Sequence, residues 1–125
     1  MSKVSAEELE NLLSNFYGTE HYYKVSPFSS ILITDGVKAF ADKCECYWLF
    51  TDFIMPECTM VSHISNFLVV EVKVTKTGMC TITAKEDTDM PPLFTKKQRD
   101  ICNIIPKGTH KFYCIDNILL LPSEY

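Results

Sequence analysis

The segment from residue 66 to residue 84 constrains the fold most, because its apolar and polar residues alternate with a period of two. Such alternation is typical of an extended strand with one buried and one wet face. The pattern breaks at Lys76-Thr77-Gly78 and then resumes, which predicts an antiparallel hairpin. The apolar members of the pattern are Leu68, Val70, Val72, Val74, Cys80, Ile82 and Ala84.

The first half of the chain shows helical spacing instead. Ser5 followed by Glu8 is typical of a capping box and predicts a helix over 5–16. A short apolar run at 31–33 predicts a strand, and Thr34 or Asp35 then caps a helix over 36–43. A further buried helix is expected over 46–55, ended by Pro56 because proline lacks the amide that a helix interior needs.

The second half contains one more hairpin. Strands are expected over 110–115 and 118–121, joined by Asp116-Asn117, a pair suited to positive φ in a tight turn. The charged, proline-containing stretch 85–97 is interpreted as a long loop, and 98–105 is ambiguous. Helices followed by strands predict one α+β domain over 1–125. We expect a mostly antiparallel sheet of four or five strands with the N-terminal helices packed on one face.

Composition bounds the class of protein. Hydrophobic residues make up 46% of the 125 residues, enough for a core without disulfide or metal staples. The net charge of −4 disfavours a general nucleic-acid binder, which needs a basic surface. The N-terminus is polar and acidic, and no apolar run is long enough to span a bilayer. We therefore expect a cytoplasmic protein without a membrane partner.

Four blocks of the sequence resemble a known family. These blocks, in order along the chain, are Phe16-Tyr17-Gly18-Thr19-Glu20-His21-Tyr22-Tyr23, Thr34-Asp35-Gly36-Val37-Lys38, Tyr47-Trp48-Leu49 and Leu119-Leu120-Leu121-Pro122-Ser123-Glu124-Tyr125. The chain resembles a domain-of-unknown-function group of small proteins from bacteria, phages and other mobile elements. The resemblance implies a phage-like setting and brings no agreed catalytic residues with it.

The six cysteines do not form a persuasive metal site. Cys44 and Cys46 are separated by one residue, whereas zinc knuckles usually have two residues between their thiolates. Buried, reduced thiols are the favoured interpretation, although Cys58 and His63 leave a zinc hypothesis open. No cofactor and no metal are expected.

The candidate binding residues are Glu20, His21, Tyr22, Tyr23, Asp35 and Tyr125. Tyrosines suit interfaces because one end is apolar and the other forms hydrogen bonds. One ring of the pair Tyr22-Tyr23 should point inward and one outward, since neighbours on an extended chain face opposite ways. We also expect Tyr125 to dock back near the segment 18–23.

Three functions remain open at the level of sequence. The leading hypothesis is a non-catalytic protein-binding module that acts on a host protein. A small hydrolase or ligand-binding enzyme could instead use Glu20, His21 and Asp35, which would have to converge in one concave site. A structural homodimer is the third alternative.

Overall fold

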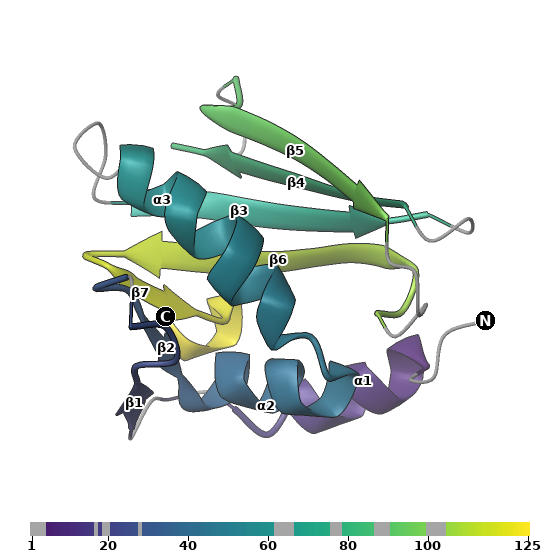
Figure 1. The fold of residues 1–125 in the computed structure, drawn as a ribbon. Coiled ribbons are helices and arrows are strands. Elements are labelled where there is room, and N and C mark those ends of the chain that lie inside the picture. Colours follow the sequence, from purple (N-terminus) through teal and green to yellow (C-terminus); the bar gives the residue numbers. More distant parts are fainter. Residues whose placement is uncertain are drawn as a thin grey trace.

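The computed structural model describes residues 5–16, 18, 21–27, 29–61, 67–75, 79–86, 91–99 and 105–125, with the backbone alone for residues 6 and 96–99. In these residues one mixed sheet carries its helices on one face, so the domain is α+β as predicted (Figure 1). The helices lie in front of the sheet in Figure 1, with α3 crossing it and α1 and α2 side by side at its lower end.

The sheet has seven strands in the described part of the chain, more than the four or five predicted. They are β1 (Tyr22–Tyr23), β2 (Leu32–Thr34), β3 (Phe67–Val74), β4 (Met79–Lys85), β5 (Phe94–Arg99), β6 (Gly108–Ile115) and β7 (Ile118–Leu120), in the order β1-β2-β7-β6-β3-β4-β5. All neighbours pair antiparallel except β2 and β7, which are parallel. Asp116 and Asn117 both have positive φ, which confirms the tight turn between β6 and β7.

The prediction of a loop over 85–97 was wrong at both ends, because Lys85 is the last residue of β4 and residues 94–97 are strand. Phe94–Arg99 forms the edge strand β5, paired with β4 from Ala84 opposite Phe94 to Met79 opposite Arg99. Charged residues are common on edge strands because they discourage pairing with other chains. Those same charges hide the alternation by which a strand is recognised in a sequence.

Helices α1 (Ala6–Leu13) and α2 (Asp35–Cys44) begin where their caps predict. The Ser5 hydroxyl accepts from the Glu8 amide, and the Thr34 hydroxyl accepts from the Val37 amide, so Thr34 rather than Asp35 is the N-cap of α2. The last turn of α2 ends at Glu45, whose φ of 51° is left-handed.

The third helical segment does not end at Pro56. A π-helix, η1 (Leu49–Ile54), runs directly into α3 (Met55–Val61), and the amide of Met55 donates to the carbonyl of Phe50. A proline removes one backbone donor and crowds the preceding turn, and a wider π-turn accommodates that interruption. The helix therefore continues past the proline to Val61.

The core lies between the helices and one face of the sheet. Val70, Val72, Ile82 and Phe112 are fully or almost fully buried on the strands, and Phe40 packs edge-on against Phe112 with ring centroids 5.1 Å apart. The opposite face of the sheet carries no helix among the described residues (Figure 1). Helix α2 buries Val37, Phe40 and Cys44 in this core. At its first turn, the block that begins at Thr34 meets the block that ends the chain.

Candidate functional site

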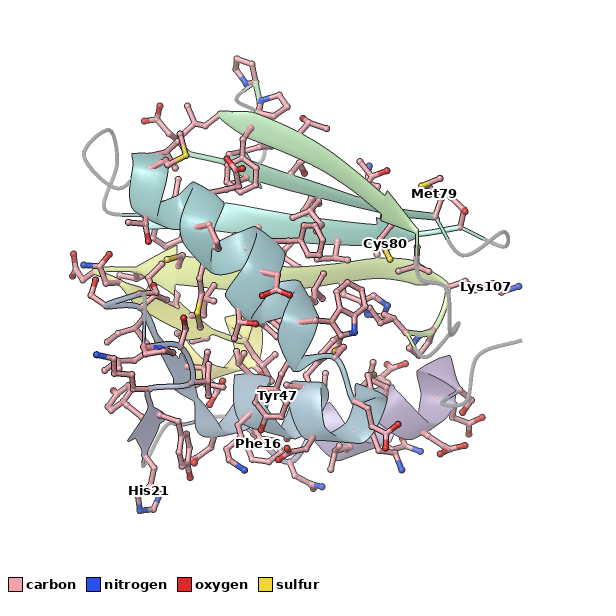
Figure 2. All side chains as sticks on the ribbon, in the orientation of Figure 1. Phe16, His21, Tyr47, Met79, Cys80 and Lys107 are labelled. Carbon is pink, nitrogen blue, oxygen red and sulfur yellow. The ribbon has the colours of Figure 1, made fainter. Side chains whose placement is uncertain are left out.

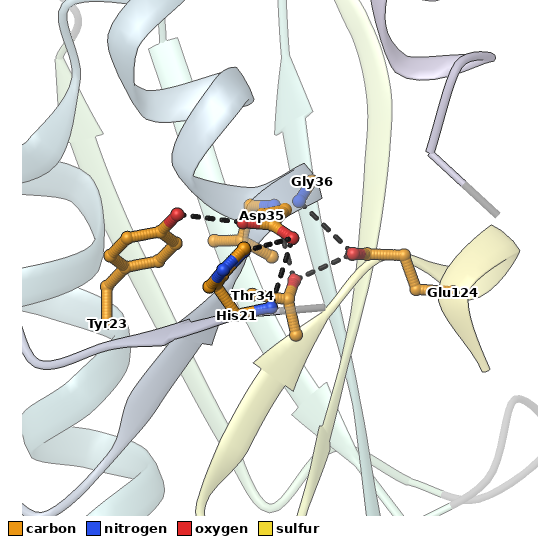
Figure 3. A network of polar contacts seen from close by, with 7 residues as sticks. His21, Tyr23, Thr34, Asp35, Gly36 and Glu124 are labelled. Atoms are coloured by element: carbon orange, nitrogen blue, oxygen red, sulfur yellow. Dashed lines mark hydrogen bonds and ion pairs between the residues drawn. The ribbon is translucent and has the colours of Figure 1, made fainter. Parts of the chain in front are cut away.

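The first turn of α2 is closed by a residue from the far end of the chain. Glu124 belongs to a short 3-10 helix, η2 (Pro122–Glu124), and its carboxylate accepts from the Thr34 hydroxyl at 2.6 Å and from the Gly36 amide at 3.1 Å (Figure 3). It also accepts from the Leu121 amide at 3.0 Å. A helix start leaves backbone amides without partners, and a carboxylate there is also favoured by the helix dipole. We call this set of contacts the C-terminal clasp.

Gly36 lets the two segments of the clasp approach closely. A Cβ atom at this position would stand 2.5 Å from Glu124 Oε1 and 2.5 Å from Leu121 Cδ1. Neither neighbour can retreat freely, because both side chains are buried. Glycine is therefore required at position 36 by packing rather than by chemistry.

A second anchor fixes the tail to the end of the first helical segment. The Ser123 hydroxyl donates to the Phe16 carbonyl at 2.7 Å, across 107 residues of sequence. The expectation that the tail docks back onto the fold is thus met by Ser123 and Glu124. Tyr125 instead packs edge-on against Phe67 and Tyr113, with ring centroids 5.8 and 5.6 Å away.

Asp35 holds the short strand β1 from the other side of α2. Its carboxylate accepts from the Tyr23 hydroxyl at 2.9 Å and from the His21 amide at 3.1 Å, and the His21 ring lies 3.7 Å from it (Figure 3). The hydrogen bond to Asp35 raises the pKa of Tyr23, and burial and the negative charge of Asp35 add to this. Lys38 lies over the Tyr23 ring at 5.4 Å.

These contacts give His21, Tyr23 and Asp35 a structural role. The two oxygens of Asp35 each accept from the protein itself, and the His21 side chain is 67% exposed at the periphery of the molecule (Figure 2). The remaining residue of the proposed acid–base set, Glu20, lies outside the described residues. In the described part of the chain, His21 and Asp35 come together, and both oxygens of Asp35 accept hydrogen bonds from within the protein.

Tyr22 and Tyr125 come together in a different place. They are 53% and 76% exposed, and Tyr23 is half-buried, so the predicted in–out arrangement of the tyrosine pair is confirmed. Both exposed rings line an open groove of about 430 Å³, whose other lining residues are Ile115, Asp116, Ile118, Leu120 and Glu124. We call this the tyrosine groove. It joins two candidates that are about a hundred residues apart in sequence.

A larger groove of about 500 Å³ lies between α1 and the start of β6. Its lining residues include Leu9, Leu13, Phe40, His110 and Leu121. The His110 imidazole is hydrogen-bonded to the Pro106 carbonyl at 2.7 Å and stacks edge-on against Phe40. Burial lowers the pKa of His110, so its uncharged form is favoured in this groove.

The cysteines behave as small buried side chains. Cys44, Cys46, Cys58, Cys80 and Cys114 are buried as thiols, whereas Cys102 and His63 lie outside the described residues. In the part of the chain that the structure describes, no three metal-ligating side chains form a cluster. The hydrogen bond with Cys114 raises the pKa of Cys58, and burial raises it further. The Cys58 thiol is therefore a poor nucleophile at neutral pH.

Two groups of residues in these sites escaped the sequence analysis. Glu124, Thr34 and Gly36 form the clasp, and the one available signal was that each lies inside a recognised sequence block. The second group is Phe67 and Tyr113, whose rings pack against each other and against Tyr125. The sequence pattern indicated strands at both positions but did not indicate that the three rings meet.

The comparisons with known proteins place the chain in a family. No helix in the described ranges has the length and apolar character to cross a membrane. No curated protein matches the chain, and no solved structure does. A family described as "Family of unknown function (DUF6876)" matches residues 7–125, nearly the whole sequence. The chain therefore belongs to this family of unknown function.

Proposed function

We propose that this chain is a non-catalytic protein-binding module that contacts its partner through the tyrosine groove. The observation that carries the proposal is the meeting of Tyr22 and Tyr125, both exposed, in one apolar groove. Buried large rings are explained by the core, but exposed rings that share a groove are not. Tyrosine is also enriched among the residues that contribute most to protein interfaces.

The groove suits one anchoring side chain. Ile115, Ile118 and Leu120 supply apolar walls, and the tyrosine hydroxyls at the rim supply hydrogen-bonding groups. An apolar centre with a polar rim is the usual anatomy of a protein interface. Residues of β6, β7 and η2 line the groove. Tyr125, which is one of its lining residues, packs against the rings of Phe67 and Tyr113, and these two rings also contact each other.

The partner we propose is a host protein. This part of the proposal rests on the resemblance of the sequence blocks to small proteins of phages and mobile elements. Binding without catalysis also agrees with the engagement of Asp35 and Glu124 by internal donors. The acid–base alternative with Glu20, His21 and Asp35 would need Asp35 to face a substrate, whereas its two oxygens accept from the His21 amide and the Tyr23 hydroxyl.

The test is capture of a partner from host lysate by three proteins: wild type, Tyr22→Ala, and a matched control. Met60→Ala is the control, because Met60 is 67% exposed on α3, at a distance from the groove in the sequence and on the helical layer. Wild type and the control should retain the same protein at equal yield. Tyr22→Ala should lose most of it while keeping its melting temperature.

Two outcomes would contradict the proposal. Equal retention by Tyr22→Ala and wild type would remove the groove from the contact surface. Light scattering that shows a dimer dissociated by Tyr22→Ala, with no other protein retained, would make the groove a homodimer contact.

A further inference from the structure

The two layers of this protein carry opposite charge. Acidic residues predominate on the helices, where Lys38 and Lys43 are outnumbered by Glu7, Glu8, Glu10, Asp35, Asp42, Asp52 and Glu57. Among strands β3 to β6, by contrast, Glu71 is the one acidic residue. The net charge of −4 therefore conceals a sheet that is basic.

The register of the strands assigns these basic residues to the face without helices. Val70, Val72 and Phe112 point into the core, so their neighbours Glu71, Lys73 and Lys111 occupy the open face. Glu71 pairs with Lys111 and Thr83, and Lys73 pairs with Thr109 and Thr81. Lys85, opposite Val69, lies on the same face. We call Lys73, Lys85 and Lys111 the lysine strip.

Glu71, the one acidic residue of strands β3 to β6, does not neutralise the strip. Glu71 forms an ion pair with Lys85 at 3.5 Å, and their side chains are 15% and 22% exposed. Lys73 is exposed and Lys111 is half-buried. The face thus carries an excess of positive charge.

The lysine strip is continuous with the tyrosine groove. Tyr113 follows Lys111 by two residues on β6 and therefore shares its face, and Tyr113 packs against Tyr125 of the groove. Tyr113 also pairs with Leu120, another residue that lines the groove. One surface thus runs from the tyrosine groove, whose lining includes Ile115, Ile118 and Leu120 together with Asp116 and Glu124, onto a basic sheet.

We infer that this surface binds an acidic, extended segment of a protein, with one apolar side chain in the tyrosine groove and carboxylates on the lysine strip. The inference rests on the proposed function, because it names the chemistry of the partner at the same groove. Charge complementarity selects the sign of the partner. Ile115, Ile118 and Leu120 line the groove beside the two rings, and these aliphatic walls favour an apolar side chain as its occupant.

The inference can be tested by amide chemical-shift titration of the isotope-labelled protein. The probes are a short peptide of glutamates around a central leucine, the same peptide with glycine in place of leucine, and a lysine peptide around leucine. The glutamate–leucine peptide should shift amides of both the groove and the strip. The glycine peptide should shift the strip alone, and the lysine peptide should bind at least about tenfold more weakly.

A charge-reversed variant supplies the matched comparison. Lys73→Glu combined with Lys111→Glu should weaken the glutamate–leucine peptide by about tenfold or more. Lys43→Glu combined with Lys107→Glu changes the net charge equally at exposed positions away from the strip and the groove, and should weaken binding by no more than about twofold. Circular dichroism confirms that each variant is folded before titration.

The possible contrary results are distinct. Equal binding of the glutamate–leucine and lysine–leucine peptides in the groove would overturn the acidic partner while leaving the proposed function intact. Shifts confined to the strip would overturn the groove, and with it the proposed function. Tighter binding of a thymidine oligonucleotide to the same lysines would make the occupant nucleic acid and overturn the inference.

Discussion

Replacing Glu124 with alanine should remove a substantial part of the stability of this domain. The carboxylate is 9% exposed and accepts from the Thr34 hydroxyl and the Gly36 and Leu121 amides. Without it, two segments separated by about ninety residues lose their direct polar link. The Thr34 hydroxyl and the Gly36 amide would also be left buried without this acceptor.

The magnitude follows from the cost of unsatisfied donors. A buried donor left without its acceptor costs about 1–3 kcal/mol, and the Thr34 hydroxyl and the Gly36 amide are two such donors, which together give about 4 kcal/mol. An unfolding entropy of about 2.1 cal/mol/K per residue gives about 0.26 kcal/mol/K for a chain of this length. A loss of about 4 kcal/mol therefore corresponds to a fall in melting temperature of about 15 °C. Glu124→Gln keeps one acceptor and should lose about 1–2 kcal/mol.

Urea denaturation followed by circular dichroism measures the effect. The midpoint should fall while the slope stays constant, since the surface exposed on unfolding is nearly the same. Glu10→Ala on the exposed side of α1 is the control and should stay within about 0.5 kcal/mol of wild type. A Glu124→Ala variant within about 1 kcal/mol of wild type would refute the clasp as a stabilising contact.

Three further predictions concern stability. Gly36→Ala should lower the free energy of unfolding by about 2–3 kcal/mol in urea titrations, because its new methyl group would meet two buried side-chain atoms at 2.5 Å; an unchanged midpoint would contradict the close packing. Tyr125→Ala should cost only about 0.5–1.5 kcal/mol, as its ring packs on Phe67 and Tyr113 but is 76% exposed; a larger loss would make that ring part of the core. Burial lowers the pKa of His110 in the folded state, so its stabilising contribution is present above the unfolded value near 6.5 and is lost as pH falls through the folded value. The melting temperature of His110→Gln should therefore depend less on pH between about 7 and 5 than that of wild type, and parallel curves would refute this assignment.

Local features of this fold could be predicted from the sequence because their causes lie within a few residues. The Ser5 cap, the Thr34 cap position and the Asp116-Asn117 turn each depend on neighbouring backbone groups. The β3–β4 hairpin follows from alternation and a short connection. These elements were correctly placed to within a few residues.

Features that depend on distant partners were missed. The Glu124 carboxylate accepts from the Thr34 hydroxyl across 90 residues, and the sequence around neither residue indicates this contact. The parallel pairing of β2 with β7 and the strand β5 likewise depend on neighbours supplied by the sheet. The π-helix before Pro56 accommodates the proline within a continuous helical segment, and residue helix propensities do not predict such a local widening.

The candidate site was predicted in part for the same reason. Tyr22 and Tyr125 were selected for their side-chain chemistry, but their shared groove exists only after β1, β7 and η2 have assembled. Net charge alone argued for an acidic surface. The segregation of lysines on one face became visible only through the strand register.

The most direct test of this account measures folding and partner binding on the same two variants. Gly36→Ala should lower the melting temperature while its folded fraction retains the captured partner, because Gly36 belongs to the clasp and does not line the groove. Tyr22→Ala should keep the melting temperature of wild type and lose the partner, because Tyr22 acts through the groove. The reverse assignment, with binding lost in Gly36→Ala at full folding and kept in Tyr22→Ala, would contradict the account.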